Sequence, residues 1–212
     1  LQARPLEADK DARALRRLAL WATRYAPSVA SWGPENGSDG FFLDITGAAH
    51  LFGGEAALLK DIVKRLRQFG LTARCAIAGT PGAAWALAHH ASAQPLILPE
   101  GQEKDALKPL PIKALRLGSE THEALHRLGF KRIAMLIAAP RAPFAARFAK
   151  ELLTRLDQAL RATPEFLHYL SPPPFYHARR SSPLPIFTQE IVATTPRQLI
   201  VSLLPSPQPH RV

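Results

Sequence analysis

The spacing of hydrophobic residues divides the chain into two differently organised halves. In the first half, apolar side chains recur every three or four residues, which predicts helices over residues 9–25, 55–69 and 83–91. Short apolar runs with β-branched and aromatic residues predict strands over residues 28–31, 41–46 and 72–78. Strands that alternate with helices are typical of an α/β layer.

The second half combines helical spacing with proline-rich stretches. Helices are predicted over residues 119–127, 131–138 and 150–161, and Ser119 is expected to cap the first of them. Residues 93–111 hold four prolines, and ten of the 20 prolines follow residue 163. The expected division is therefore an α/β unit, a linker, a helical unit and a proline-rich tail, over residues 1–92, 93–111, 112–163 and 164–212.

Composition adds a strong positive charge to this picture. The chain has 27 Lys and Arg against 17 Asp and Glu, a formal net charge of +10. Residues 1–99 carry 11 basic and 8 acidic side chains, whereas residues 100–212 carry 16 and 9. The excess is concentrated in the second half, and it suits a nucleic acid, an anionic surface or an acidic small molecule.

The remaining composition excludes several classes of protein. Hydrophobic residues make up 47% of the chain, too many for a wholly disordered one. Cys75 is the single cysteine, which excludes an internal disulfide framework and favours a reducing, cytoplasmic location. Glycines and prolines interrupt the uncharged residues 75–99, so no membrane span is expected. The chain starts at Leu1 without a signal peptide, and we expect it to be part of a longer protein.

Several short motifs together resemble one protein family. Residues 39–47 (Asp-Gly-Phe-Phe-Leu-Asp-Ile-Thr-Gly), 50–55 and 72–78 resemble a polymerase palm, and residues 115–117, 128–129, 140–141 and 155–160 resemble its thumb. Their order is similar to that in the Y-family translesion DNA polymerases (UmuC/DinB-like), and most similar to the ImuB-type branch. The resemblance implies an α+β fold with a partial α/β palm, a small all-helical helix-hairpin-helix thumb and a proline-rich tail that begins a further DNA-binding domain.

The resemblance also indicates where a polymerase site would lie. Nucleotidyl transfer needs carboxylates that hold two divalent metal ions. Active members of the family have an Asp-Glu pair where this chain has Asp39 and Gly40, and another Asp on a first strand that we expect before Leu1. Trp85 stands at a position where they carry a lysine near the triphosphate. We therefore expect a degenerate site without catalytic residues, metal or cofactor, and Mg²⁺ only if the protein were an active polymerase.

DNA contacts are expected in the helical unit. Residues 125–133 are typical of a helix-hairpin-helix, in which a glycine turn lets the following backbone amides face a phosphate. The candidate DNA-binding residues lie at this turn and the next one: Arg127, Gly129, Lys131, Arg132, Arg147 and Lys150. No feature suggests reading of base edges, so binding would be independent of sequence. A helical hairpin with ordinary solvated bases is the alternative.

Other candidate sites carry less weight. His89 and His90 are adjacent and suit surface positions better than a shared metal ion, and Cys75 suits a small core residue. His122 and His126 lie one helical turn apart, but no third metal ligand appears at suitable spacing. Residues 198–201 faintly resemble a sliding-clamp-binding peptide, although they lack its aromatic end.

These observations favour a non-catalytic, polymerase-like DNA-repair protein that binds primer-template DNA and supports translesion synthesis by a partner polymerase. The resemblance implies the partners, which are a replicative-type error-prone polymerase and a sliding clamp. Two alternatives remain open. One is an active error-prone DNA polymerase of which only part is present, and the other is a protein-interaction module that does not bind DNA.

Overall fold

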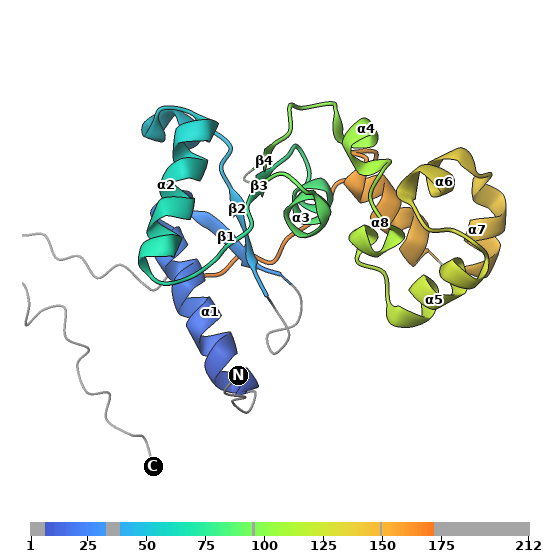
Figure 1. The fold of residues 1–212 in the computed structure, drawn as a ribbon, viewed down its shortest axis with the longest axis horizontal. Helices are drawn as coiled ribbons and strands as arrows, with labels where there is room; N and C mark the ends of the chain where they lie inside the picture. The colour runs from blue at the N-terminus through green and yellow to red at the C-terminus, as the bar shows by residue number, and fades with distance from the viewer. Residues whose placement is uncertain (1–6, 33–38, 95, 149, 172–212) are drawn as a thin grey trace, which may run out of the picture. The chain divides into compact units, whose positions relative to one another are not determined.

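The computed structural model describes residues 7–32, 39–94, 96–148 and 150–171. Residue contacts divide the chain into residues 1–170 and 171–212, and the described residues lie in the first unit apart from Ser171. This unit combines short strands among its first helices with a run of helices after β4, which confirms the α+β class (Figure 1). The first elements are α1 (Ala8–Ala22), β1 (Ser28–Ser31), β2 (Phe41–Asp44), the 3₁₀ helix η1 (Ala49–Phe52), α2 (Glu55–Gln68), β3 (Ala76–Ile77), α3 (Pro81–His90) and β4 (Leu96–Ile97).

The strands form two separate two-stranded sheets within the described residues. Strands β1 and β2 pair antiparallel, whereas β3 and β4 pair parallel across the α3 crossover. The outer edge of β1 is covered by Tyr169 and Leu170, and the Leu170 N–H donates to the Val29 carbonyl at 2.7 Å. The predicted strand at residues 72–78 is wrong in length, because only Ala76 and Ile77 pair with a neighbour.

Two hydrophobic cores hold the elements together. In the first, Leu58, Ile62 and Leu66 of α2 pack around Tyr25, as the predicted apolar stripe requires. The second core joins α3 to the helices that follow, namely α4 (Glu103–Leu107), the 3₁₀ helix η2 (Ile112–Leu115), α5 (Ser119–Arg127), α6 (Ile133–Ala138), α7 (Arg141–Arg147) and α8 (Glu151–Ala159). The α3 helix therefore packs with the helical half, although the sequence groups it with residues 1–92.

The stretch predicted as a linker is folded wherever the structure describes it. Strand β4 and helix α4 both lie within residues 93–111. Leu107 is fully buried and Leu110 is buried in the second core. The Leu110 carbonyl also accepts a hydrogen bond from the Ile133 N–H at 3.0 Å. Pro99, Pro109 and Pro111 lie between these short elements and do not keep the segment extended.

The predicted helices of the second half need three corrections. Ser119 is the first helical residue and Gly118 is the N-cap, with no capping side-chain hydrogen bond. The sequence predicts no helix between residues 138 and 150, yet α7 forms there with Pro143 in its first turn. A proline in the first turn is compatible with a helix because the N–H groups there have no intrahelical acceptor. The tail also begins later than residue 164, because Glu165 and Tyr169 contact the preceding unit.

One buried tyrosine connects α1 to α2 in the first core. The Tyr25 hydroxyl donates to Asp61 Oδ2 at 2.7 Å, and Arg65 Nε donates to the same oxygen at 2.7 Å. Burial, together with the hydrogen bond to Asp61, raises the pKa of Tyr25 to about 12. The hydrogen bonds from Tyr25 and Arg65 in turn lower the pKa of Asp61. The tyrosine therefore stays protonated and keeps donating across the neutral range.

Candidate functional site and nucleic-acid interface

The structure brings together the residues that the sequence assigned to the polymerase-like site. Asp39 and Gly40 lie just before β2, and Trp85 lies on α3. His89, one helical turn after Trp85, connects them: its Nε2 is 3.1 Å from Asp39 Oδ2. Its ring stacks on Trp85 with centroids 4.0 Å apart. Sequence reasoning placed Asp39 and Trp85 in one site but treated His89 as an ordinary surface residue.

Aromatic rings surround Trp85, the residue at which the sequence resemblance implies a lysine in active polymerases. The Trp32 ring lies 5.0 Å from the Trp85 ring, measured between centroids. The Arg116 guanidinium lies 4.7 Å from the Trp32 centroid, a cation–π distance. A cavity of about 550 Å³ adjoins the cluster and is lined mostly by apolar residues of β2, α2 and α3. Stacked rings offer a triphosphate neither the charge nor the N–H donors that bind it.

The oxygen ligands at this site do not fit the two-metal clamp of a polymerase. Asp39 provides one carboxylate, which His89 already contacts, and Gly40 has no side chain to coordinate a metal. Asp44 does not join them, since its Oδ1 accepts from the Thr46 N–H at 3.1 Å and stabilises a local turn. No step of nucleotidyl transfer can be derived through metal ions held by these residues.

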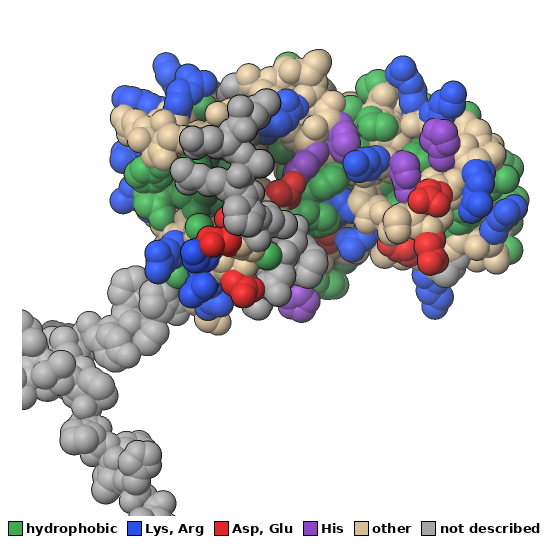
Figure 2. Space-filling model, turned by 60° about the horizontal axis from the view of Figure 1, so that its bottom comes forward, with side chains coloured by type: hydrophobic (Ala, Val, Ile, Leu, Met, Phe, Trp, Pro, Cys, Tyr) green, Lys and Arg blue, Asp and Glu red, His purple; other side chains and the backbone are tan. Residues whose placement is uncertain are grey.

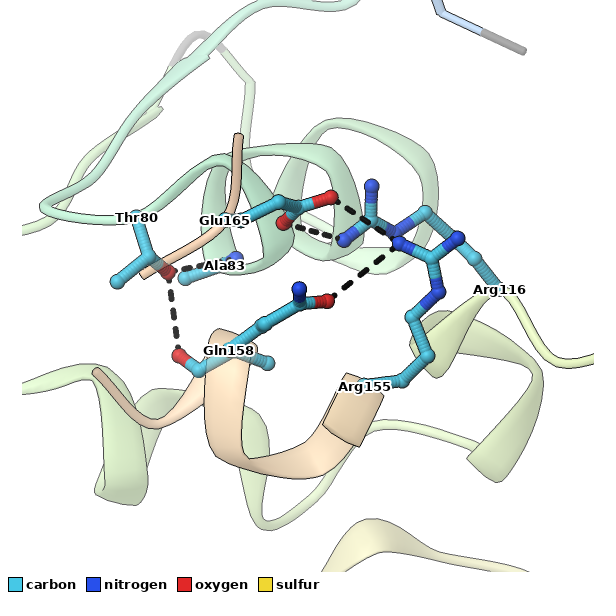
Figure 3. Close-up of polar contacts among 7 residues, drawn as sticks. Thr80, Ala83, Arg116, Arg155, Gln158 and Glu165 are labelled. Atoms are coloured by element: carbon cyan, nitrogen blue, oxygen red, sulfur yellow. Dashed lines mark hydrogen bonds and ion pairs between the residues drawn. The ribbon is translucent and has the colours of Figure 1, made fainter. Parts of the chain in front are cut away.

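The N-terminus of α3 is fixed to the helical half by hydrogen bonds that Figure 3 shows. Thr80 caps α3: its Oγ1 accepts from the Ala83 N–H at 3.1 Å and donates to the Ala159 carbonyl at 3.1 Å. Pro81 follows at the first helical position, where its missing N–H costs nothing. A threonine followed by a proline is a common start of a helix, so this capping role could have been predicted from the sequence.

A buried ion cluster lies beside this junction (Figure 3). Glu165 Oε2 accepts from Arg116 Nη2 at 2.7 Å, and Glu165 Oε1 accepts from Arg155 Nη1 at 3.2 Å. The Arg116 side chain is 3% exposed and that of Glu165 is 6% exposed. Because Arg116 also faces Trp32, the cluster connects the helical half to the polymerase-like site.

The predicted DNA-binding side chains lie at two helical turns, as the sequence indicated. Gly129 has a φ of +85°, so the turn after α5 uses the left-handed conformation that glycine favours. Between α7 and α8 lies the second turn. The cations of both turns are exposed: Arg127, Lys131 and Arg132 at the first, and Arg147 and Lys150 at the second.

The expectation that backbone amides after Gly129 face a phosphate needs correction. The Phe130 N–H donates to the Leu125 carbonyl at 3.0 Å, and the Ile133 N–H donates to the Leu110 carbonyl at 3.0 Å. The Lys131 N–H points to Met135 Sδ at 3.5 Å. These three donors are used within the protein, so the exposed cationic side chains are the stronger candidates for phosphate contacts at the first turn.

Positive charge is not confined to the helical turns. Figure 2 shows Lys and Arg side chains over the helices of the second core, at the right of the view, and over the α1 and α2 region at the left. Exposed cations on the first two helices include Arg13, Arg16 and Arg17 of α1 and Lys60, Lys64 and Arg67 of α2. A test of DNA binding must therefore separate local contacts from diffuse attraction.

The remaining candidates have ordinary structural environments. Burial, followed by repulsion from His89, lowers the pKa of His90, and burial raises the pKa of the Cys75 thiol. The rings of His122 and His126 lie 6.4 Å apart between centroids. In the part of the chain that the structure describes, no three His, Cys, Asp or Glu side chains gather as a metal site would require. Residues 198–201 lie outside that part.

None of the described helices combines the length and apolar character that crossing a bilayer requires.

Some curated proteins are similar in sequence to this chain. The chain matches proteins named ImuB from the Caulobacter vibrioides strains NA1000 / CB15N and ATCC 19089 / CIP 103742 / CB 15. Each is 48% identical over 162 residues, which make up 76% of this chain and 34% of the relative. No family model and no solved structure matches the chain.

This identity confirms the resemblance that the palm and thumb motifs indicated. The chain is a Y-family-polymerase-like sequence, with the α+β architecture described above. Within that class it is of the ImuB type. It spans about a third of the length of the curated relatives it matches.

Proposed function

We propose that this protein acts in DNA-damage tolerance as a non-catalytic, polymerase-like scaffold. In this role it binds primer-template DNA without sequence preference and supports translesion synthesis by a separate, replicative-type error-prone polymerase. A sliding clamp is the further partner that the family resemblance suggests. The ImuB-type similarity supports a role in the response to DNA damage. The exposed cations of the helical turns support DNA binding, and the residues of the polymerase-like site support the absence of catalysis.

One observation carries the non-catalytic part of the proposal. Asp39 contacts His89, Gly40 stands at the position of the metal-binding glutamate, and Trp85 stacks where a lysine would meet the triphosphate. Three separate requirements of nucleotidyl transfer are therefore altered at one place. A protein that keeps the palm architecture without this chemistry is suited to holding DNA for another enzyme.

Primer extension tests this part of the proposal. The full-length protein from which these residues come is expected to add no nucleotide to a primer-template with Mg²⁺ or Mn²⁺. Asp39→Ala is expected to leave that background unchanged, because one carboxylate cannot hold both metal ions. Templated extension that Asp39→Ala abolishes would instead establish the active-polymerase alternative.

The exposed cations of the helical turns carry the DNA-binding part. Lys131→Glu with Arg132→Glu is expected to lower affinity for a labelled primer-template, measured by fluorescence anisotropy across a salt series. Each lost phosphate contact should flatten the slope of log affinity against log salt by about 0.9 on duplex DNA. The double variant should therefore flatten the slope by roughly 1.8.

Lys64→Glu with Arg65→Glu on α2 is the matched control. It changes the net charge equally, but α2 leads through the Gly70 turn into β3 and not into a second helix, so it forms no helical hairpin. We expect a much smaller loss of affinity and almost no change of slope. Equal losses from both double variants would indicate diffuse charge attraction and remove the support for the hairpin assignment.

A further inference from the structure

The outer flank of α2 carries a groove that neither the polymerase-like site nor the helical turns use. Ala56, Leu59 and Val63 of α2 line it, with Ile97 of β4 on the opposite side. The groove has a volume of about 730 Å³, and its surface is mainly apolar. Val63 and Ile97 are only half-buried, so the apolar floor remains open to solvent.

Three cations form the rim of this groove on its helical side. Lys60, Lys64 and Arg67 follow one another at helical spacing and are exposed. The nearby Asp61 pairs directly with Arg65 and Tyr25, and it attracts Lys64 only at longer range. Among the described residues, the ion pairs do not include any of these three cations. The flank therefore combines an apolar floor with a positive rim whose three cations form no direct ion pair with a described residue.

We propose that this groove docks an acidic amphipathic helix of a partner protein. The apolar face of such a helix would cover Leu59, Val63 and Ile97, and its Asp or Glu side chains would meet the three cations. From Ala56 to Arg67 the groove follows roughly 16 Å of α2, about three turns, which suits a short helix. A nucleic-acid backbone would satisfy the cations but would gain little from the apolar floor, so the combination favours a peptide.

Synthetic peptides test the proposal on the full 212-residue chain. The probe is a labelled peptide of roughly 15 residues with leucines along one helical face and glutamates beside them. The control peptide has the same composition, with the leucines shuffled around the helix. Fluorescence anisotropy is expected to show about tenfold weaker binding of the shuffled peptide, since it cannot present an apolar face to the groove.

Two triple variants of the protein distinguish binding by the cations of the rim from attraction by the overall positive charge. Lys60→Glu, Lys64→Glu and Arg67→Glu together are expected to weaken binding of the first peptide about tenfold, from three exposed ion pairs. Arg13→Glu, Arg16→Glu and Arg17→Glu on α1 change the charge equally and are expected to weaken it less than about twofold. All six positions are exposed, so neither triple variant should prevent folding.

The Ala56→Arg variant tests whether peptide binding depends on the open shape of the groove or on its positive charge. It adds a cation but places a long side chain in the groove, so we expect it to weaken peptide binding. Stronger binding by Ala56→Arg, equal binding of both peptides, or equal effects of the two triple variants would each overturn the proposal. So would a loss of DNA affinity in the α2 triple variant as large as that in the Lys131, Arg132 variant. That last result would show that the cations of α2 contribute to DNA binding, and it would also remove the support for the hairpin assignment, whereas the other three outcomes leave the proposed function untouched.

Discussion

Replacement of Glu165 by alanine is expected to lower the free energy of unfolding by about 3–5 kcal/mol. The Glu165 carboxylate is the counter-charge of two arginines, and its side chain is 6% exposed. Without it, the Arg116 guanidinium remains buried and unpaired. Among the described residues, the Nε and Nη1 atoms of Arg116 have no hydrogen-bond partner, so loss of the carboxylate would leave a third Arg116 nitrogen, Nη2, without its acceptor. A loss of this size is a large share of the stability of an ordinary domain.

Urea unfolding followed by circular dichroism measures this loss. Glu100→Ala is the matched control, because Glu100 forms an exposed ion pair with Arg161 and should cost less than about 1 kcal/mol. Joint replacement of Arg116 and Glu165 by methionine should restore much of the stability, since it removes both buried charges. If Glu165→Ala costs no more than Glu100→Ala, the cluster is not the buried ion network described here.

Leu107→Ala should destabilise the protein by about 2–5 kcal/mol, because it leaves a cavity in the second core. Leu107 lies on α4 and is fully buried. It belongs to residues 93–111, where the sequence predicted a linker. The same replacement in a flexible linker would cost almost nothing, so this variant tests the domain boundary directly.

Leu51→Ala provides the comparison, because the Leu51 side chain is 73% exposed. Its effect should stay within about 0.5 kcal/mol. Urea unfolding of the two variants on the same chain gives the difference. Equal effects would mean that residues 93–111 form a linker, as their prolines suggest.

Helix α3 connects the polymerase-like site to the helices that carry the candidate DNA-binding turns. The α3 helix carries Trp85 and His89 on one side and contributes Ala83, Ala86 and Leu87 to the core that supports the helical turns. Packing of this kind is rigid, so it holds the polymerase-like site and the candidate DNA-binding turns in one frame. A fixed frame is what the proposed scaffold role requires, and it needs no metal-dependent chemistry from this site.

Helices with strong apolar spacing were predictable from the sequence. The stripe of α2 repeats every three or four residues, and the predicted range of 55–69 differs from Glu55–Gln68 by one residue. The family resemblance also pointed to Asp39, Gly40 and Trp85 as positions of one site, and the structure places Asp39 and Trp85 on either side of His89. Apolar spacing is a local signal, because the apolar face of a helix can be recognised from a few neighbouring residues.

Only the tertiary structure decided which distant residues meet. His89 contacts Asp39 across 50 positions of sequence, and Arg116 pairs with Glu165 across 49. Neither pairing has a local signature, because it depends on how the first strands, α3 and α8 pack together. The same packing buries Leu107, although the prolines around it predict a linker. It also provides acceptors for the Phe130 and Ile133 N–H groups, although the glycine turn predicts that these groups face a phosphate. The sequence alone thus determined the helices with strong apolar spacing, such as α2, and long-range burial decided the remaining elements and the partners of distant residues.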